Sequence, residues 1–324
     1  MSAKGISIFA KKRFFAMQSH FEQKIIATIL MLLCAIWLHG QPKPTTHYAA
    51  LWCTGGYSAL LYTHPDVAVL GHVGSSMGLG YEYQAGGNFF FQIGTEFTIL
   101  TSLMRHDDFR DDREMFDTDA LPDGTPWYDS VTFHADFHRL HEMQRIGYVQ
   151  FPLLLGMQFD GWRISVGGKA SIALFANYTT RGRCTTTGTY RWFHEDLTDM
   201  PNHYYRSNFV VRDNGVLHLG LNIAATLAVD FDITPVNFGN KLLLFGAFCD
   251  YGLLDINRSP CNRQFLTYHE NPTQFSINSM LNTPDAAHKR VTPLYCGCKL
   301  TLRFCVGISR RHTCNCYNTY LKQH

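Results

Sequence analysis

Apolar and polar residues alternate in long runs from about residue 48 to residue 306. In residues 72 to 84, one face carries Val73, Ser75, Met77, Leu79, Tyr81 and Tyr83, and the other carries mainly glycine and polar residues. The same period of two runs through residues 88 to 100 and residues 216 to 231. Because successive side chains of a strand point to opposite faces, this pattern predicts long strands with one apolar face.

Eight such segments follow one another along the chain. They are residues 48 to 62, 72 to 84 and 88 to 100, two within 148 to 178, and then 216 to 231, 242 to 254 and 291 to 306. Many of them run 13 to 17 residues, whereas a globular strand has about 5 to 6 and a tilted strand crosses a bilayer with about 9 to 11. The pattern predicts an all-β fold, namely an eight-stranded antiparallel up-and-down transmembrane β-barrel.

The links between these segments predict an orientation. Short links ("AGG", Asp160-Gly161 and about "ITPVNFGN") alternate with long links near 105 to 145, 185 to 213 and 257 to 290. Outer-membrane barrels have short periplasmic turns, long external loops and aromatic girdles. Aromatic residues at the short-link ends are Tyr81, Tyr83, Phe89, Phe159, Trp162, Phe231 and Phe304. We therefore expect a bacterial outer-membrane location, with outer-membrane lipid as a partner.

The first forty residues are typical of an export signal. Lys24 precedes an apolar stretch from Ile25 to Leu38, and His39, Gly40 and a polar segment follow. This order predicts a signal peptide over residues 1 to 40. The barrel is expected over residues 41 to 306 and a periplasmic tail over 307 to 324.

Composition narrows the function classes. The chain is 46% apolar and 17% charged, with a formal net charge of +2. This balance gives no reason to expect nucleic acid as a partner. The mean hydropathy of −0.12, together with the lack of a long apolar run after residue 40, argues against a helical membrane protein.

The predicted inward face carries charges that balance in two layers. The expected mid-height layer holds Glu96, Asp250, Lys169 and Lys299, and the layer nearer the periplasm holds Glu82, Asp230, Arg163 and Arg303. The interior of an eight-stranded barrel is just wide enough for side chains to fill it. We therefore predict a plug of paired charges, with Lys299 meeting Asp250 and Arg163 meeting Asp230. A gated ion path is the alternative.

Residues 105 to 145 predict an acidic external loop, with nine Asp and two Glu against five Arg. If the preceding strand continues upward, His134, Asp136 and His138 share one face. Imidazole and carboxylate together are suitable ligands for a transition metal, so these three residues form a candidate metal site. A solvated loop is the favoured interpretation, with the metal site as the alternative, and no cofactor is expected.

Cysteines and prolines add local predictions. Cys184 and Cys261 lie at the roots of two external links and are a candidate disulfide, while Cys296 and Cys298 share the lipid-facing side of the last strand. Pro152 and Pro293 fall inside predicted strands, where each removes a ladder hydrogen bond. A bulge or a strand end is expected at each proline.

Three stretches carry a family resemblance. "YVQFPLLLG" at 148 to 156, "GLGYEY" at 78 to 83 and "KLTLRF" at 299 to 304 resemble the PorT-like outer-membrane β-barrel proteins of Bacteroidetes, over roughly residues 48 to 306. The resemblance implies an outer-membrane barrel. For some relatives it also implies a link to protein secretion.

The favoured function is binding, adhesion or secretion and assembly through the external loops, with an extracellular or periplasmic protein as partner. A small-solute channel is the main alternative. A lipid-modifying enzyme is the third, using His72 with Ser76, or His218. Since neither set includes an evident nucleophile, base and orienting group, we expect no enzyme.

Overall fold

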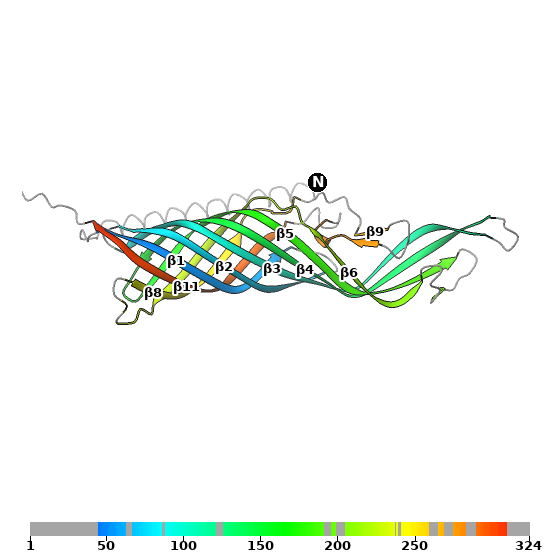
Figure 1. Cartoon of the computed structure of the whole chain (residues 1–324), viewed down its shortest axis with the longest axis horizontal. Helices are drawn as coiled ribbons and strands as arrows, with labels where there is room; N and C mark the ends of the chain where they lie inside the picture. The colour runs from blue at the N-terminus through cyan, green and yellow to red at the C-terminus, as the bar shows by residue number, and fades with distance from the viewer. Residues whose placement is uncertain are drawn as a thin grey trace, which may run out of the picture.

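The computed structural model describes residues 45–62, 67–85, 88–120, 126–190, 196–198, 205–236, 238, 241–258, 265–268, 275–282 and 290–309. The predicted signal peptide and most of the predicted tail lie outside these ranges. The described part consists almost wholly of antiparallel strands (Figure 1). No helix within it is long and apolar enough to cross a membrane.

Eight strands form a closed antiparallel ring. They are β1 (Thr45–Leu61), β2 (Ala68–Gln84), β3 (Phe89–Ala120), β4 (Pro126–Gln158), β5 (Trp162–Tyr190), β7 (Asn222–Asp232), β8 (Lys241–Gly252) and β11 (Thr292–Ser309). Each pairs with the next in this order, and β11 closes the ring on β1. The predicted all-β class and the antiparallel up-and-down order of eight strands are confirmed.

Three shorter strands and one helical turn of the described part do not belong to this ring. β6 (Arg206–Val216) pairs with the far part of β5. β9 (Leu266–Tyr268) and β10 (Phe275–Ile277) form a small hairpin, followed by the 3-10 turn η2 (Met280–Asn282). We call the ring end with the short links at 85–88, 159–161 and 233–240 the turn end, and the opposite end the loop end.

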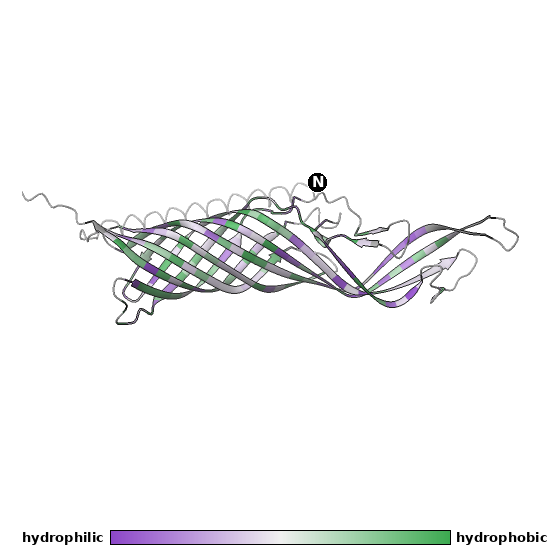
Figure 2. Ribbon diagram, viewed as in Figure 1, coloured by the Kyte–Doolittle hydropathy of each residue, from purple (hydrophilic) through white to green (hydrophobic). Residues whose placement is uncertain are grey.

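The predicted faces are present in the ring. In β4, Phe151, Leu153 and Leu155 are 48%, 52% and 60% exposed, whereas the intervening Leu154 is buried. In β7, Leu227 points outward and the flanking Thr226 is buried. Figure 2 shows this alternation as hydrophobic and hydrophilic bands along the strands. The apolar face lies outside the ring, and most of the polar face lies inside.

The predicted loop at 105 to 145 is wrong. β3 and β4 continue as one hairpin beyond the loop end, paired as far as Ala120 and Pro126, and β5 with β6 extends beside them (Figure 1). Phe133, Ala135 and Phe137 are all buried on one face of this hairpin, which shows that the alternation of faces persists there. We call this projecting sheet of β3, β4, β5 and β6 the arm.

The predicted single strand at 216 to 231 is also wrong. β6 pairs with residues 177 to 186 of β5, whereas β7 pairs with residues 162 to 171 of the same strand. The chain therefore steps from one level of β5 to the other between Val216 and Asn222. Leu217, which was expected to face outward, lies buried at this step, and its amide donates to the carbonyl of Ala176 at 2.8 Å.

The prolines behave differently from one another. Pro293 is the second residue of β11, so the expected strand end is confirmed. Pro152 lies within β4 and pairs with Lys169 of β5. The β3–β4 ladder lapses between Ile93↔Leu153 and Glu96↔Gln150 but keeps its register. Because Pro152 has no amide hydrogen, the β3–β4 ladder is interrupted there. The bulge that was expected at this proline does not form.

The disulfide also differs from the predicted one. Cys249 of β8 and Cys296 of β11 face one another, with Cα atoms 4.1 Å apart, and are bonded. Cys184 is a buried free thiol, and Cys261 lies outside the described residues. Cys296 and Cys298 both point away from the ring interior, as expected, because Tyr295 and Lys299 beside them are buried.

Candidate functional site: the charged interior and its apolar cap

The interior at the turn end holds a chain of buried ion pairs. Arg163 Nη1 donates to Glu82 Oε2 at 2.8 Å, and Arg163 Nε donates to Asp230 Oδ2 at 2.8 Å. Arg303 Nη2 donates to the other oxygen of Glu82. All four residues are at most 1% exposed. The expected pair of Arg163 and Asp230 is therefore formed, since the two residues are direct cross-strand partners.

A second layer lies nearer the middle of the ring. Lys169 Nζ donates to Asp250 Oδ2 at 2.8 Å and to Glu96 Oε2 at 3.1 Å, and Trp52 Nε1 donates to the same Glu96 oxygen at 3.1 Å. The predicted pair of Lys299 and Asp250 is not formed. Lys299 lies opposite Gly246 in the ladder, four residues from Asp250, and its Nζ lies 5.8 Å from the Trp52 ring centre.

Aromatic rings fill the space around these charges. Arg303 lies over Tyr48 at 3.9 Å from its ring centre, and Arg163 lies over Phe90 at 5.0 Å. Cations at these distances are attracted to the ring faces. The cavity beside Trp52, Lys169 and Lys299 has a volume of only 10 Å³, which is about the room that one water needs. The interior is thus packed at this level.

The eight predicted interior charges contain equal numbers of acids and bases. Four acids (Glu82, Glu96, Asp230, Asp250) face four bases (Arg163, Lys169, Lys299, Arg303). Buried charges are tolerated when they are paired and hydrogen-bonded, and removal of one partner leaves the other uncompensated. The arrangement fixes strands β2, β3, β5, β7, β8 and β11 to one another across the interior.

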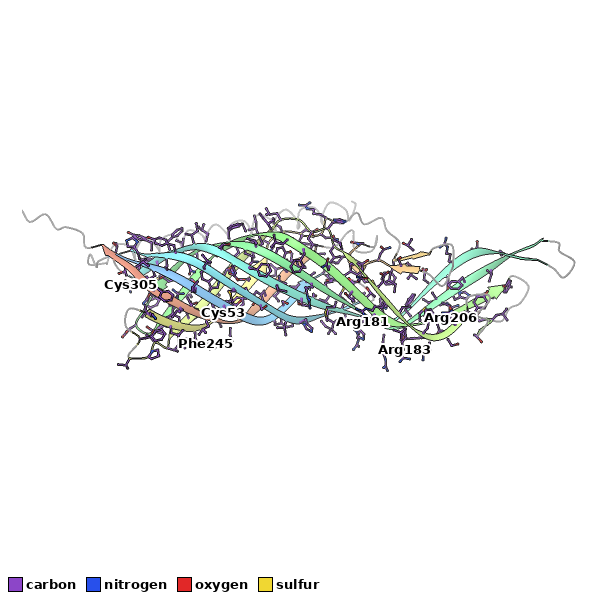
Figure 3. All side chains as sticks on the ribbon, in the orientation of Figure 1. Cys53, Arg181, Arg183, Arg206, Phe245 and Cys305 are labelled. Atoms are coloured by element: carbon purple, nitrogen blue, oxygen red, sulfur yellow. A yellow bond between two sulfur atoms is a disulfide. The ribbon has the colours of Figure 1, made fainter. Side chains whose placement is uncertain are left out.

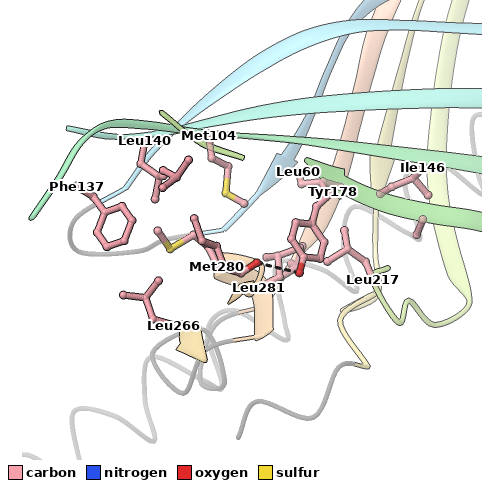
Figure 4. Packing of buried hydrophobic residues seen from close by; sticks show 14 of the residues in the cluster. Leu60, Met104, Phe137, Leu140, Ile146, Tyr178, Leu217, Leu266, Met280 and Leu281 are labelled. Atoms are coloured by element: carbon pink, nitrogen blue, oxygen red, sulfur yellow. Dashed lines mark hydrogen bonds between the residues drawn. The ribbon is translucent and has the colours of Figure 1, made fainter. Parts of the chain in front are cut away.

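The loop end of the interior holds an apolar cluster together with buried polar side chains such as Ser102 and Gln144. Figure 4 shows Met280 and Leu281 packed among Leu60, Tyr178 and Leu217. The covering residues come from segment 275–282, which we call the cap. Leu281 is fully buried, and the Tyr178 hydroxyl donates to the carbonyl of Ile277 at 3.1 Å. The cap closes the end of the ring opposite the short links.

One acid of β4 holds the cap. Glu142 is 2% exposed and accepts from Ser279 Oγ at 2.5 Å, from the Met280 amide at 3.0 Å and from Gln144 Nε2 at 2.8 Å. It lies past Arg145, beyond the outward apolar band. No described cation forms an ion pair with it, and burial raises the pKa of this carboxyl above its usual value. Glu142 therefore differs from the paired acids at the turn end.

The three candidate metal ligands share one face of β4 but have separate partners. His134 Nδ1 lies 2.6 Å from Asp112 Oδ1, and its Nε2 lies 2.9 Å from Thr189 Oγ1. His138 contacts Asp108 at 3.0 Å, and Asp136 faces Arg110 at 3.8 Å. Among the residues with described positions, no three His, Cys, Asp or Glu side chains are grouped to hold a metal ion. The structure does not assemble the predicted site.

The candidate catalytic residues are not assembled either. Ser76 is buried, and its hydroxyl lies 2.5 Å from Thr54 Oγ1, which in turn lies 2.6 Å from the Tyr295 hydroxyl. His72 contributes its main-chain carbonyl to Ser58 at 3.5 Å. Ser76 is thus engaged in a hydroxyl chain with Thr54 and Tyr295, and not with a histidine base.

Comparisons with known proteins give little. No protein family matches the chain, and no curated protein matches it. Among solved structures, the translocator domain of the autotransporter NalP from Neisseria meningitidis is 7% identical, over 89% of this chain and 97% of that one, with a TM-score of 0.20. OccK8 (OprE) of Pseudomonas aeruginosa is 9% identical, over 82% and 98%, with a TM-score of 0.09. These scores are far below those of a shared fold, so the interpretation rests on the geometry above.

Glu142 is the main residue that the sequence interpretation misplaced, since it was counted among the acids of a loop. A usable pattern was present. Glu142, Gln144, Ile146, Tyr148 and Gln150 alternate with outward residues, and all five are buried. Extending the strand parity upward from Gln150 would have placed Glu142 inside.

Proposed function

We propose that this chain is an integral outer-membrane β-barrel with a plugged lumen, whose external part acts as a binding, adhesion or assembly surface. One observation carries the proposal: the ring exposes aliphatic side chains outward and buries ion pairs inward. Soluble proteins rarely expose apolar patches larger than about a few hundred Å². A ring of outward Leu, Val, Ile and Phe side chains is favourable if lipid surrounds it.

Ring closure supports this membrane position. A lipid-exposed strand edge would leave backbone groups unsatisfied, so spanning strands must close on themselves. Outward aromatic residues gather at the turn end, where Phe159 stacks on Trp162 at 4.3 Å and Trp162 pairs with Phe231. Such a cluster suits an interfacial girdle. The turn end is proposed to face the periplasm, and the arm the outside.

The packed interior favours a plugged barrel and not an open channel. Side chains fill the ring at the level of Lys169, and the cap covers the loop end. We therefore do not propose solute transport. Within the described ranges, Ser76 is engaged with Thr54 and not with a histidine, so catalysis is not proposed either. The resemblance to PorT-like proteins, and the link to secretion that it implies, remain predictions.

The arm supports the proposed surface role. It presents a polar face that includes Arg110, Asp112 and Asp136. An extracellular protein that docks on this face is the proposed partner.

Fractionation and conductance test the membrane part of the proposal. We expect the chain in the outer-membrane fraction, with a gel mobility that changes on heating, and no conductance in planar bilayers. A strong conductance in Lys169→Ala alone would favour a gated path instead. A folded chain that stays in solution without detergent would overturn the proposal.

Arm trimming tests the surface role. An Asn-Gly turn joining His106 directly to Leu140, which are cross-strand partners, would shorten the arm while the ring stays paired, because this dipeptide forms a tight hairpin turn. Surface partners captured by the whole chain should be lost from the trimmed chain. Equal capture by both would contradict a role for the arm.

A further inference from the structure

Basic side chains form a row across neighbouring strands on the outer surface. His141 of β4 pairs directly with Arg181 of β5, which pairs directly with Arg212 of β6. The adjacent residues Leu140, Thr180 and Val211 are buried, so all three basic side chains point outward. Arg181 and Arg212 are like charges directly opposite one another, and such a pair destabilises a sheet unless negative charge compensates it.

The described part of the chain does not supply that charge. Arg145, Arg181 and Arg212 form no ion pair with any acid in the described ranges. The nearby Asp213 accepts instead from the Ile277 amide at 2.6 Å. The Nδ1 atom of His141 is buried without a hydrogen-bond partner. Within the described ranges, no acid is paired with these arginines, so they can still bind an anion from outside the chain.

These side chains border a hollow and not a flat surface. An open groove of 740 Å³ is lined by the basic residues His141, Arg145, Arg181 and Arg212, and by the apolar residues Leu103, Met143 and Val216, among others. Figure 3 places Arg181 where the ring narrows into the arm, with Arg183 and Arg206 farther along. The groove therefore combines converging cations with apolar walls.

The groove lies at the upper edge of the outward apolar band. Along β5 toward the turn end, Thr179 and Asn177 continue the groove from Arg181. The apolar Leu174 and Ile172, which are 61% and 54% exposed, come next on the outer surface. Along β4, Arg145 precedes the outward Phe151 in the same way. A molecule with a charged head and apolar chains could place the head in the groove and the chains on the band.

We propose that this groove binds an anionic, phosphorylated lipid of the leaflet around the loop end. Arg145, Arg181 and Arg212 bind its phosphates, because the planar guanidinium matches phosphate oxygens with two parallel hydrogen bonds. Its acyl chains lie along Ile172 and Leu174. This inference rests on the proposed membrane position and adds a defined lipid site to it. Three arginines and the groove volume suit a head group with more than one phosphate.

Native mass spectrometry of the detergent-solubilised full chain tests the site. The probes are lipid A with two phosphates, the same lipid after dephosphorylation, phosphatidylcholine and inorganic phosphate. We expect retention of the phosphorylated lipid only, and an affinity at least about tenfold lower in the combined Arg145→Gln, Arg181→Gln and Arg212→Gln variant. Arg206→Gln, an exposed arginine outside the groove, should bind like the unchanged chain.

Each other outcome has a definite meaning. Equal retention by the triple variant and Arg206→Gln would overturn the site. Binding of inorganic phosphate as strongly as the lipid would show an anion site without a lipid preference and would also overturn it. A chain that shows heat-modifiable mobility yet binds no lipid defeats this inference alone, whereas a chain that is folded and water-soluble defeats the proposed function as well.

Discussion

The two ends of the ring interior are held by different forces. At the turn end, Glu82 and its arginine partners belong to the ring strands themselves, so the ion pairs form when the ring closes. At the loop end, Leu281 and the rest of the cap come from a separate segment that packs on apolar side chains. We therefore expect the charged half to fix the barrel and the cap to open without the ring unfolding.

The largest expected effect follows removal of the shared acid at the turn end. Glu82→Ala leaves Arg163 and Arg303 buried without their common partner, and breaking a buried pair typically destabilises by about 3 to 5 kcal/mol. Unfolding in urea from phospholipid vesicles, followed by tryptophan fluorescence, should show a loss of this size. The exposed Asn88→Ala serves as the control. A loss similar to that of the control would contradict the role assigned to the charged half.

A change in the cap should act locally. Leu281→Ala removes a fully buried side chain, which typically costs about 3 kcal/mol. We expect amide hydrogen exchange to accelerate in residues 275 to 282 while the ring strands keep their protection. If β1 and β11 lost protection to the same extent, the two halves would form one cooperative unit. That result would contradict the separate opening of the cap.

The smallest of these effects is a pH dependence of the cap. Burial raises the pKa of Glu142, so the closed state holds the proton more tightly than an open state with the usual pKa of about 4.3. The stability that this proton confers is fully present below the open-state value and is lost as pH rises through the raised pKa. Cap protection, corrected for the intrinsic exchange rate, should therefore fall over that window.

Glu142→Gln provides the matched variant for this pH dependence. It keeps a side chain of the same shape and removes the titrating group, so cap protection should become independent of pH over the same window. A pH dependence that persists unchanged in this variant would assign the effect to another group.

The fold could be predicted from the sequence to a large extent. Alternation in stretches such as 72 to 84 predicts strand, face and order together, because a period of two has few structural alternatives. The arm was missed because aspartate and arginine occupy both faces around Asp111, which hides the alternation. The step from β6 to β7 was missed because the apolar parity continues from Leu217 to Leu221 although the chain there changes level on β5.

The interior could be predicted only in part. Which charges point inward follows from parity, and the pair of Arg163 and Asp230 follows from strand adjacency. The partner of Asp250 could not be predicted in this way, because the pairing depends on the stagger between strands and on how far Lys169 reaches across the interior. The cap is even harder to predict from the sequence. Ser279 meets Glu142 across 137 positions of sequence, and no periodic pattern marks its segment.

The folding free energy of Leu153→Arg in phospholipid vesicles tests the central claim most directly. Leu153 is 52% exposed and lies midway along the outward apolar band of β4. If lipid surrounds that band, arginine there should reduce the stability by about 2 to 4 kcal/mol, whereas Asp160→Arg in the turn should have little effect. An unchanged stability for Leu153→Arg, or a folded water-soluble variant, would contradict the account.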